Sequence, residues 1–244
     1  DAQKLLDNTT LFSPGDIIVF MGGNYQQKQN TLFNYFLLFT RNLGSASNPT
    51  TIMGYPGHDV FVDMKTANPL GGHRIFGTYQ TADNTEGLVI SNFRAHSGGQ
   101  RVFDSDSNYV RFVNNDIQGM NLTASGTGMI ASHGNFYNVL GNVIHNSGAS
   151  RLYHSIYWGF GHDIEIGWNH FYDIYGGRGI QTRNGVATPK LYNFDIHNNV
   201  FHDTEKDAIG LGDESTTGFR IYNNIIYRTG MGQTIVGNEG ISGI

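Results

Sequence analysis

The octapeptide IEIGWNHF, residues 164–171, is one of five similar stretches in this chain. Apolar side chains occupy its first, third and eighth positions, and an asparagine occupies the sixth. The other stretches are VRFVNNDI (110–117), YNVLGNVI (137–144), FDIHNNVF (194–201) and FRIYNNII (219–226). Apolar residues that alternate over so short a distance are typical of a β-strand with one buried face. The sequence therefore predicts one strand that recurs along the chain.

The asparagine of the octapeptide marks a repeat of 23–30 residues. The marker residues are Asn92, Asn115, Asn142, Asn169, Asn199 and Asn224. A period in this range is typical of a solenoid. A helical solenoid would need runs of about ten or more residues with a 3.6-residue period, and the repeats contain none. We therefore predict an all-β, single-domain parallel β-helix over residues 1–244, with regular coils at about 87–238.

A second short strand is expected after each marker asparagine. Its inward residue lies 10–14 positions after the marker, which indicates coils of similar circumference. These inward residues are Met129, Ile156, Ile180, Ile209 and Ile235. Asparagine tolerates the left-handed conformation that a turn needs, and stacked asparagines about 4.8 Å apart can bond to one another. We therefore interpret the markers as scaffold residues rather than as part of a site.

Composition narrows the range of functions. The net charge is −5 and no stretch is rich in lysine or arginine, which disfavours nucleic-acid binding. The chain has no cysteine, so disulfides and thiol chemistry are excluded. The nearest candidate for a membrane span, LFNYFLLF (32–39), is much shorter than the roughly 18–20 residues that a span requires.

Both ends of a solenoid need a cover, because an open coil exposes strand edges and apolar core. At the N-terminal end, DAQKLLDNT (1–9) predicts a short amphipathic capping helix within residues 1–12, with Asp1 as its cap. The stretch TIVGNEGISGI (234–244) has the character of a coil without a polar cap. We expect a partner chain or a further chain segment to cover that coil.

The segments SPGDIIVFMGGNY (13–25) and NPTTIMGYPGHDVFVD (48–63) follow the expected helix. A capping helix, a PGD turn before an apolar strand, and an extended P-x-T-I-x-G-x-P-G segment together resemble the opening of right-handed parallel β-helix polysaccharide lyases. The group of chondroitinase B and alginate lyases is the most similar. The resemblance implies a right-handed β-helix that cleaves an acidic, uronate-containing polysaccharide by β-elimination. It also implies a secreted, periplasmic or cell-surface protein.

The catalytic set of that lyase group does not carry over to this chain. The resemblance implies a lysine and an arginine on neighbouring coils, with acidic residues and an asparagine that hold calcium nearby. The five lysines of this chain fall on none of the aligned strand rows. Calcium is therefore left open as a cofactor, and no metal ligand is predicted.

Alignment of the second strands places polar residues on one outer face. The residues so placed are His154, Tyr157, Arg178, Gln181, Arg183 and Asp207, with His133 and Asp213 beside them. Since adjacent coils are about 4.8 Å apart, the main set spans roughly 10 Å along the axis. A uronate chain could lie along such a face, with its carboxylates against arginine.

β-Elimination needs a base for the proton α to the carboxylate and a positive charge for the developing enolate. Arg178 or Arg183 could neutralise the enolate. His154 or Tyr157 could act as the base, and Tyr157 as the acid for the leaving oxygen. The predicted substrate-binding residues are His133, Trp168, Gln181, Asp207 and Asp213. In the structural alternative, Arg178 and Asp207 form only a surface ion pair.

The fold alone does not choose among activities, because β-helices host several. We favour a polysaccharide lyase. A non-catalytic carbohydrate-binding, adhesin or phage-tail-type protein is the first alternative, and a uronate epimerase or glycoside hydrolase is the second. A hydrolase would need two carboxylates flanking one sugar bond, such as Asp207 with Asp213 or Glu214. A second outer row mixes charge signs and predicts pairing between coils: Arg111, Asn138, Glu165, Asp195 and Arg220.

Overall fold

The computed structural model describes residues 13–26, 35–39, 44–63, 74–78, 86–96, 101–119, 127–147, 151–182, 191–212 and 217–231. The expected capping helix in residues 1–12 lies outside these ranges, as does the stretch 234–244 with Ile235. The described ranges form 23 β-strands. Within them, no helix has the length and apolar character needed to cross a membrane.

The strands form three parallel sheets, named here sheet A, sheet B and sheet C. Sheet A contains β1 (Ile17–Phe20), β4 (Thr50–Gly54), β7 (Glu86–Ser91), β10 (Asn108–Val113), β13 (Tyr137–Leu140), β16 (Gly161–Gly167), β19 (Leu191–His197) and β22 (Thr217–Tyr222). Sheet B contains β2 (Gly23–Gln26), β5 (Val60–Asp63), β8 (Arg94–His96), β11 (Asp116–Gln118), β14 (Val143–Ser147), β17 (His170–Ile174), β20 (Val200–Thr204) and β23 (Ile225–Thr229). Sheet C contains β3 (Tyr35–Phe39), β6 (Arg74–Thr78), β9 (Arg101–Ser105), β12 (Thr127–Ser132), β15 (Tyr153–Trp158), β18 (Ile180–Thr182) and β21 (Ile209–Gly210).

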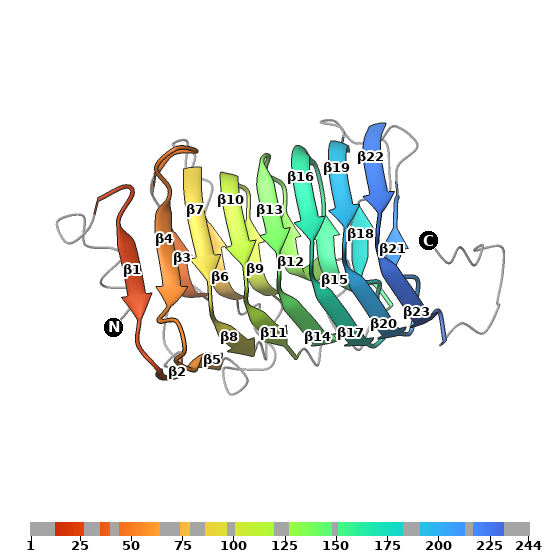
Figure 1. Cartoon of the computed structure of the whole chain (residues 1–244), viewed down its shortest axis with the longest axis horizontal. Coiled ribbons are helices and arrows are strands. Elements are labelled where there is room, and N and C mark those ends of the chain that lie inside the picture. The colour runs from red at the N-terminus through yellow and green to blue at the C-terminus, as the bar shows by residue number, and fades with distance from the viewer. Residues whose placement is uncertain are drawn as a thin grey trace.

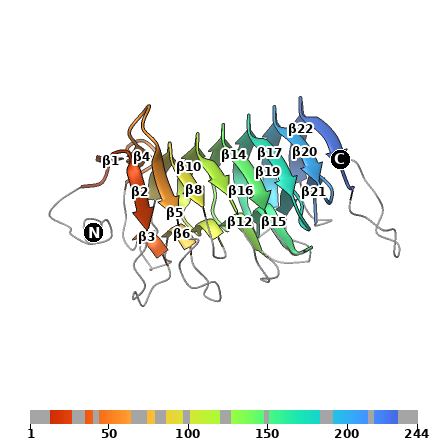
Figure 2. The same cartoon turned by 90° about the horizontal axis from the view of Figure 1, so that it is seen from below.

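The chain visits sheets A, B and C in turn, so three successive strands make one coil (Figure 1). The coils wind right-handed, and the molecule is a parallel β-helix (Figure 1). Figure 2 shows the same stack from below, with the strands following one another along the axis. The coils already begin at Ile17, well before residue 87, where the repeat becomes visible in the sequence.

Each octapeptide runs from a strand of sheet A through the turn into a strand of sheet B, in the register that the sequence predicts. Their first apolar positions are paired strand to strand: Val110, Tyr137, Ile164, Phe194 and Phe219. The first four of these side chains are buried in the core. Aromatic rings stack from coil to coil inside the solenoid, as Phe171 does on Phe201 at 4.5 Å. Burial of these apolar surfaces, worth roughly 25 cal/mol per Å², is the main force that holds neighbouring coils together.

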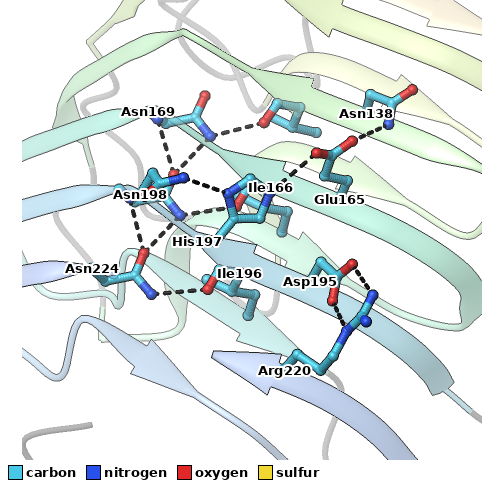
Figure 3. A network of polar contacts seen from close by, with 12 residues as sticks. Asn138, Glu165, Ile166, Asn169, Asp195, Ile196, His197, Asn198, Arg220 and Asn224 are labelled. Carbon is cyan, nitrogen blue, oxygen red and sulfur yellow. Dashed lines mark hydrogen bonds and ion pairs between the residues drawn. The ribbon is translucent and has the colours of Figure 1, made fainter. Parts of the chain in front are cut away.

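The marker asparagines form a hydrogen-bonded ladder at the turn between sheets A and B. From Asn115 onward, each Nδ2 donates to the Oδ1 of the next asparagine at 3.0–3.2 Å, and each Oδ1 also accepts the backbone N–H of the preceding one. Figure 3 shows the last part of this ladder. The assignment of Asn92 to the ladder was wrong, because Phe93 occupies that position and its N–H donates to Asn115 Oδ1. Asn92 instead aligns with Asn114, whose Nδ2 donates to Asn92 Oδ1 at 2.6 Å.

The left-handed conformation belongs to the residue that precedes each ladder position, not to the ladder asparagines themselves. The left-handed row is Asn92, Asn114, Gly141, Trp168, Asn198 and Asn223, with φ between 53° and 65°. Asparagine and glycine tolerate this conformation, whereas it costs other residues about 1–2 kcal/mol. Trp168 is the member of this row that is neither asparagine nor glycine.

The predicted register of sheet C was wrong by one residue in β12. Ile130, not Met129, pairs with Ile156, and both Met129 and Ile130 are buried. Two consecutive inward residues break the strict alternation on which the sequence alignment depended. As a result Ser132 points into the core, where its Oγ donates to the Ser105 carbonyl at 2.8 Å.

Candidate functional site

Sheet C carries two outward rows of side chains, fixed by its strand pairing. The inward reference row is Phe76, Phe103, Ile130, Ile156, Ile180 and Ile209. Two positions earlier, the outward row is Arg74, Arg101, Gly128, His154, Arg178 and Asp207. One position later, it is Gly77, Asp104, Ala131, Tyr157, Gln181 and Gly210. The predicted site residues that come together on adjacent coils are His154, Tyr157, Arg178, Gln181 and Asp207, which we call the sheet C cluster.

Arg178 holds the sheet C cluster together. Its Nε donates to Asp207 Oδ2 at 3.1 Å, and its Nη1 donates to Gln181 Oε1 at 2.8 Å. Asp207 is only 6% exposed, while the Arg178 side chain is 23% exposed. No further hydrogen bond from this guanidinium is present among the described residues, so its Nη2–H groups can donate to a ligand. The predicted ion pair is therefore real, and it fixes the orientation of a partly exposed cation.

His154 is a neutral hydrogen-bond donor in this setting. Its Nδ1 accepts the backbone N–H of Arg178 at 3.1 Å, so the proton of the neutral ring lies on Nε2. Burial, followed by the positive charges of Arg178 and Lys206, lowers the pKa of His154 to about 3. Tyr157 is less buried and stacks on His154 with ring centroids 5.9 Å apart. The geometry thus favours Tyr157 over His154 as the group that accepts a proton.

The buried imidazole of His154 predicts acid sensitivity of the fold. Between pH 6.5 and about 3, the unfolded chain binds a proton on His154 that the folded chain excludes. The free energy of unfolding therefore falls as the pH drops through this window, by about 2 kcal/mol at pH 5 from this group alone. The free energy of unfolding, measured with urea, should differ less between pH 5 and pH 7.5 in His154→Gln than in the original protein. The matched control is His58→Gln, which removes an exposed imidazole. If the two substitutions reduced the pH dependence of the free energy of unfolding equally, His154 would not be the source of the acid sensitivity.

A second charged group on the same outer face was missed by the sequence alignment. Arg74 Nη1 lies 2.8 Å from Asp104 Oδ2, and Arg101 Nη1 is bonded to Asp104 Oδ1. Gly128 and Ala131 lie between this group and the sheet C cluster, and neither has a long side chain to cover the face there. The overlooked sequence signal is a recurring tetrapeptide: RIFG (74–77), RVFD (101–104), HSIY (154–157) and RGIQ (178–181).

Two of the other predicted site residues, His133 and Trp168, do not join the sheet C cluster. His133 follows β12, where its Nδ1 lies 2.8 Å from Asp106 Oδ1 and its ring stacks on Phe160. Arg183 and Asp213 lie outside the described residues. Trp168 lies in the turn between β16 and β17, at the edge between sheets A and B, and is therefore not on the sheet C face.

The mixed row on sheet A pairs between coils. Asp195 is bonded to Arg220 through both carboxylate oxygens, and Glu165 accepts Asn138 Nδ2 at 2.7 Å. Glu165 Oε1 also lies 3.1 Å from His197 Nε2 (Figure 3). Glu165 and Asp195 therefore each have their own partners. In the described ranges, no three histidine, aspartate or glutamate side chains gather as ligands for a metal ion.

Comparison with known proteins finds a likeness among solved structures. Neither a protein-family model nor a curated protein matches the chain. Among solved structures, the chain is similar to the A-module of the mannuronan C-5 epimerase AlgE6 from Azotobacter vinelandii, with 13% sequence identity and a TM-score of 0.44. The match covers 86% of this chain and 58% of that module, so this chain spans little more than half of the module's length.

Proposed function

We propose that the protein acts on an acidic polysaccharide by removing the proton α to a uronate carboxylate, with β-elimination as the outcome. One observation supports this above all. The buried Asp207 and the amide of Gln181 orient the partly exposed Arg178 beside His154 and Tyr157. A fixed cation, a neutral donor and a phenol on one face are the groups that this chemistry needs.

Each residue has a role in the proposed reaction. A uronate carboxylate lies against Arg178 Nη2 and His154 Nε2–H, which stabilise the charge that develops when the carbon α to the carboxylate loses its proton. Tyr157, reacting as the phenolate, takes that proton on its oxygen. The bond from the β carbon to the glycosidic oxygen then breaks, a carbon–carbon double bond forms, and the departing oxygen takes the proton from Tyr157, which returns to the phenolate. Return of a proton to the opposite face instead, without bond cleavage, would give epimerisation.

Incubation with alginate, polygalacturonate and chondroitin in D2O tests this function and separates its outcomes. A rise in absorbance at the unsaturated-uronate band is the expected result and indicates elimination. Deuterium incorporation at the uronate without chain cleavage would show proton removal without elimination, and so favour an epimerase. Retention on polymer gels with neither signal would overturn the enzymatic proposal and favour a binding protein. Tyr157→Phe should remove either signal, and Tyr175→Phe, at an exposed tyrosine outside the sheet C cluster, is the matched control.

The hydrolase alternative has less support from the described residues. Asp207 is buried and bonded to Arg178, so it is poorly placed to give a proton to a glycosidic oxygen. Its suggested partners, Asp213 and Glu214, lie outside the described residues. Since acidic polysaccharides are components of cell walls, capsules and matrices, we propose a secreted, periplasmic or cell-surface location.

A further inference from the structure

Trp168 combines two features that the fold itself does not require. It adopts a φ of 55° in a row whose other members are asparagine or glycine, and its side chain is 57% exposed. A bulky residue in this conformation is strained, and an exposed indole gives up the stabilisation that burial would provide. Strain of this kind is concentrated at functional positions. Trp168 is therefore a candidate for ligand contact.

The surroundings of Trp168 leave one face of the indole open. The indole is perpendicular to the His197 ring, with centroids 4.6 Å apart. Gly167 lies against one face of that imidazole, and Tyr222 stacks on the other at 5.1 Å. The indole therefore meets the imidazole edge with one of its own faces, and because Trp168 is 57% exposed, we infer that its second face is open to a ligand. Tyr222, itself 44% exposed, extends the aromatic surface along the axis.

A polar cavity lies beside this aromatic surface on sheet A. Its volume is 590 Å³, and its polar lining is Asp163, Glu165, Asn193, Asp195 and Arg220. Glu165 connects the two regions, because its Oε1 lies 3.1 Å from His197 Nε2, as Figure 3 shows. Three carboxylates against one guanidinium make the cavity acidic, so it repels anionic sugars.

We propose that Trp168, Tyr222 and this cavity form a second carbohydrate-binding surface, and that its ligand is a neutral sugar unit of a glycan. The apolar C–H face of a pyranose packs on the open indole, and its hydroxyls donate to Glu165 and Asp195. The acidic lining distinguishes this surface from the sheet C cluster, where Arg178 is suited to a uronate. The two surfaces lie on different sheets of the coil, so this proposal does not depend on the proposed lyase activity.

Trp168→Asn tests the proposal because stability and binding should change in opposite directions. Asparagine suits the left-handed conformation, so the melting temperature should rise by about 2–4 °C. The Kd for immobilised cellohexaose, mannohexaose or chitohexaose should rise at least about tenfold for whichever of these the original protein binds. Hexagalacturonate serves as the anionic comparison and should bind this surface more weakly. Tyr55→Ala is the matched control, because Tyr55 is an exposed aromatic residue at the edge between sheets A and B in an earlier coil. This variant should leave the Kd for the neutral hexasaccharide unchanged.

Three results would overturn the proposal. They are no binding of the original protein to any neutral hexasaccharide, unchanged affinity in Trp168→Asn, or a lower melting temperature in that variant, which would show that the indole is a packing residue. The double variant Arg178→Gln with Asp207→Asn, which removes both charges of the buried ion pair, separates the two proposals, since it should lower action on polyuronates at least about 100-fold and leave neutral-sugar binding unchanged. If the protein showed no activity on polyuronates but bound a neutral hexasaccharide in a Trp168-dependent way, the proposed function would be wrong and this inference would be supported.

Discussion

Replacement of Asn169 by alanine is expected to lower the free energy of unfolding by about 3 kcal/mol, because it leaves several buried groups without partners. Asn169 is 1% exposed, in the middle of the ladder. Its Oδ1 accepts the backbone N–H and the Nδ2 of Asn142, at 2.9 and 3.0 Å. Its Nδ2 donates to Asn199 Oδ1 at 3.0 Å and to the Val139 carbonyl at 2.8 Å. Alanine removes all four bonds and offers no replacement.

Asn224→Ala is the matched control for this prediction. Asn224 lies at the last described position of the ladder and is only partly buried, so water can replace its lost hydrogen bonds. We expect a loss of about 1 kcal/mol there. Urea unfolding followed by circular dichroism measures both variants. Equal losses at the two positions would show that water enters the middle of the ladder and that the buried amide bonds are not what holds the turn.

The sequence predicts the fold well because sheet A alternates cleanly between inward and outward residues. In Ile164, Glu165 and Ile166 the pattern assigns each side chain to the correct face. The same regularity identifies Arg178 and Asp207 as neighbours on adjacent coils, which their ion pair bears out. Repetition carries the prediction, since an error in one coil is corrected by the others.

The sequence predicts the register less well where either of two adjacent residues could hold the same position in a coil. At Asn92 the following residue is phenylalanine, and in the pairs 114–115, 198–199 and 223–224 the first asparagine is left-handed while the second is in the ladder. A single marker letter cannot distinguish these two roles. In β12, Met129 and Ile130 are both buried, so hydrophobicity alone cannot set the register. Strand pairing across coils decides both cases.

The burial of His154 could not be read from its position in the outward row. It faces outward on β15, yet it is only 4% exposed, because neighbouring side chains and backbone cover it. Exposure depends on the side chains and backbone of the neighbouring coils, which the outward row of one strand does not contain. The tautomer of His154, and hence its role as donor, depends on the backbone N–H of Arg178, which no residue pattern encodes.

Loss of the Arg178 guanidinium is expected to lower kcat/KM on a polyuronate about 100–1000-fold, because the cation stabilises the developing enolate in the proposed reaction. The single variant Arg178→Ala would mix two effects, because it leaves the buried carboxylate of Asp207 without its partner, and breaking such a pair costs several kcal/mol. The double variant Arg178→Gln with Asp207→Asn removes both charges and keeps hydrogen-bonding amides of similar size. It should remain folded and lose the activity.

Asp207→Asn alone separates the two roles of the ion pair. It keeps the cation at Arg178, where Gln181 still accepts from Nη1, but loosens the orientation of the guanidinium. We expect a loss of about tenfold in kcat/KM, much smaller than for the double variant. Steady-state kinetics and thermal unfolding of the three proteins provide the comparison. If the folded double variant kept its activity, the Arg178–Asp207 pair would be structural, and the reacting groups would have to be sought elsewhere on the sheet C face, beginning with Arg74, Arg101 and Asp104.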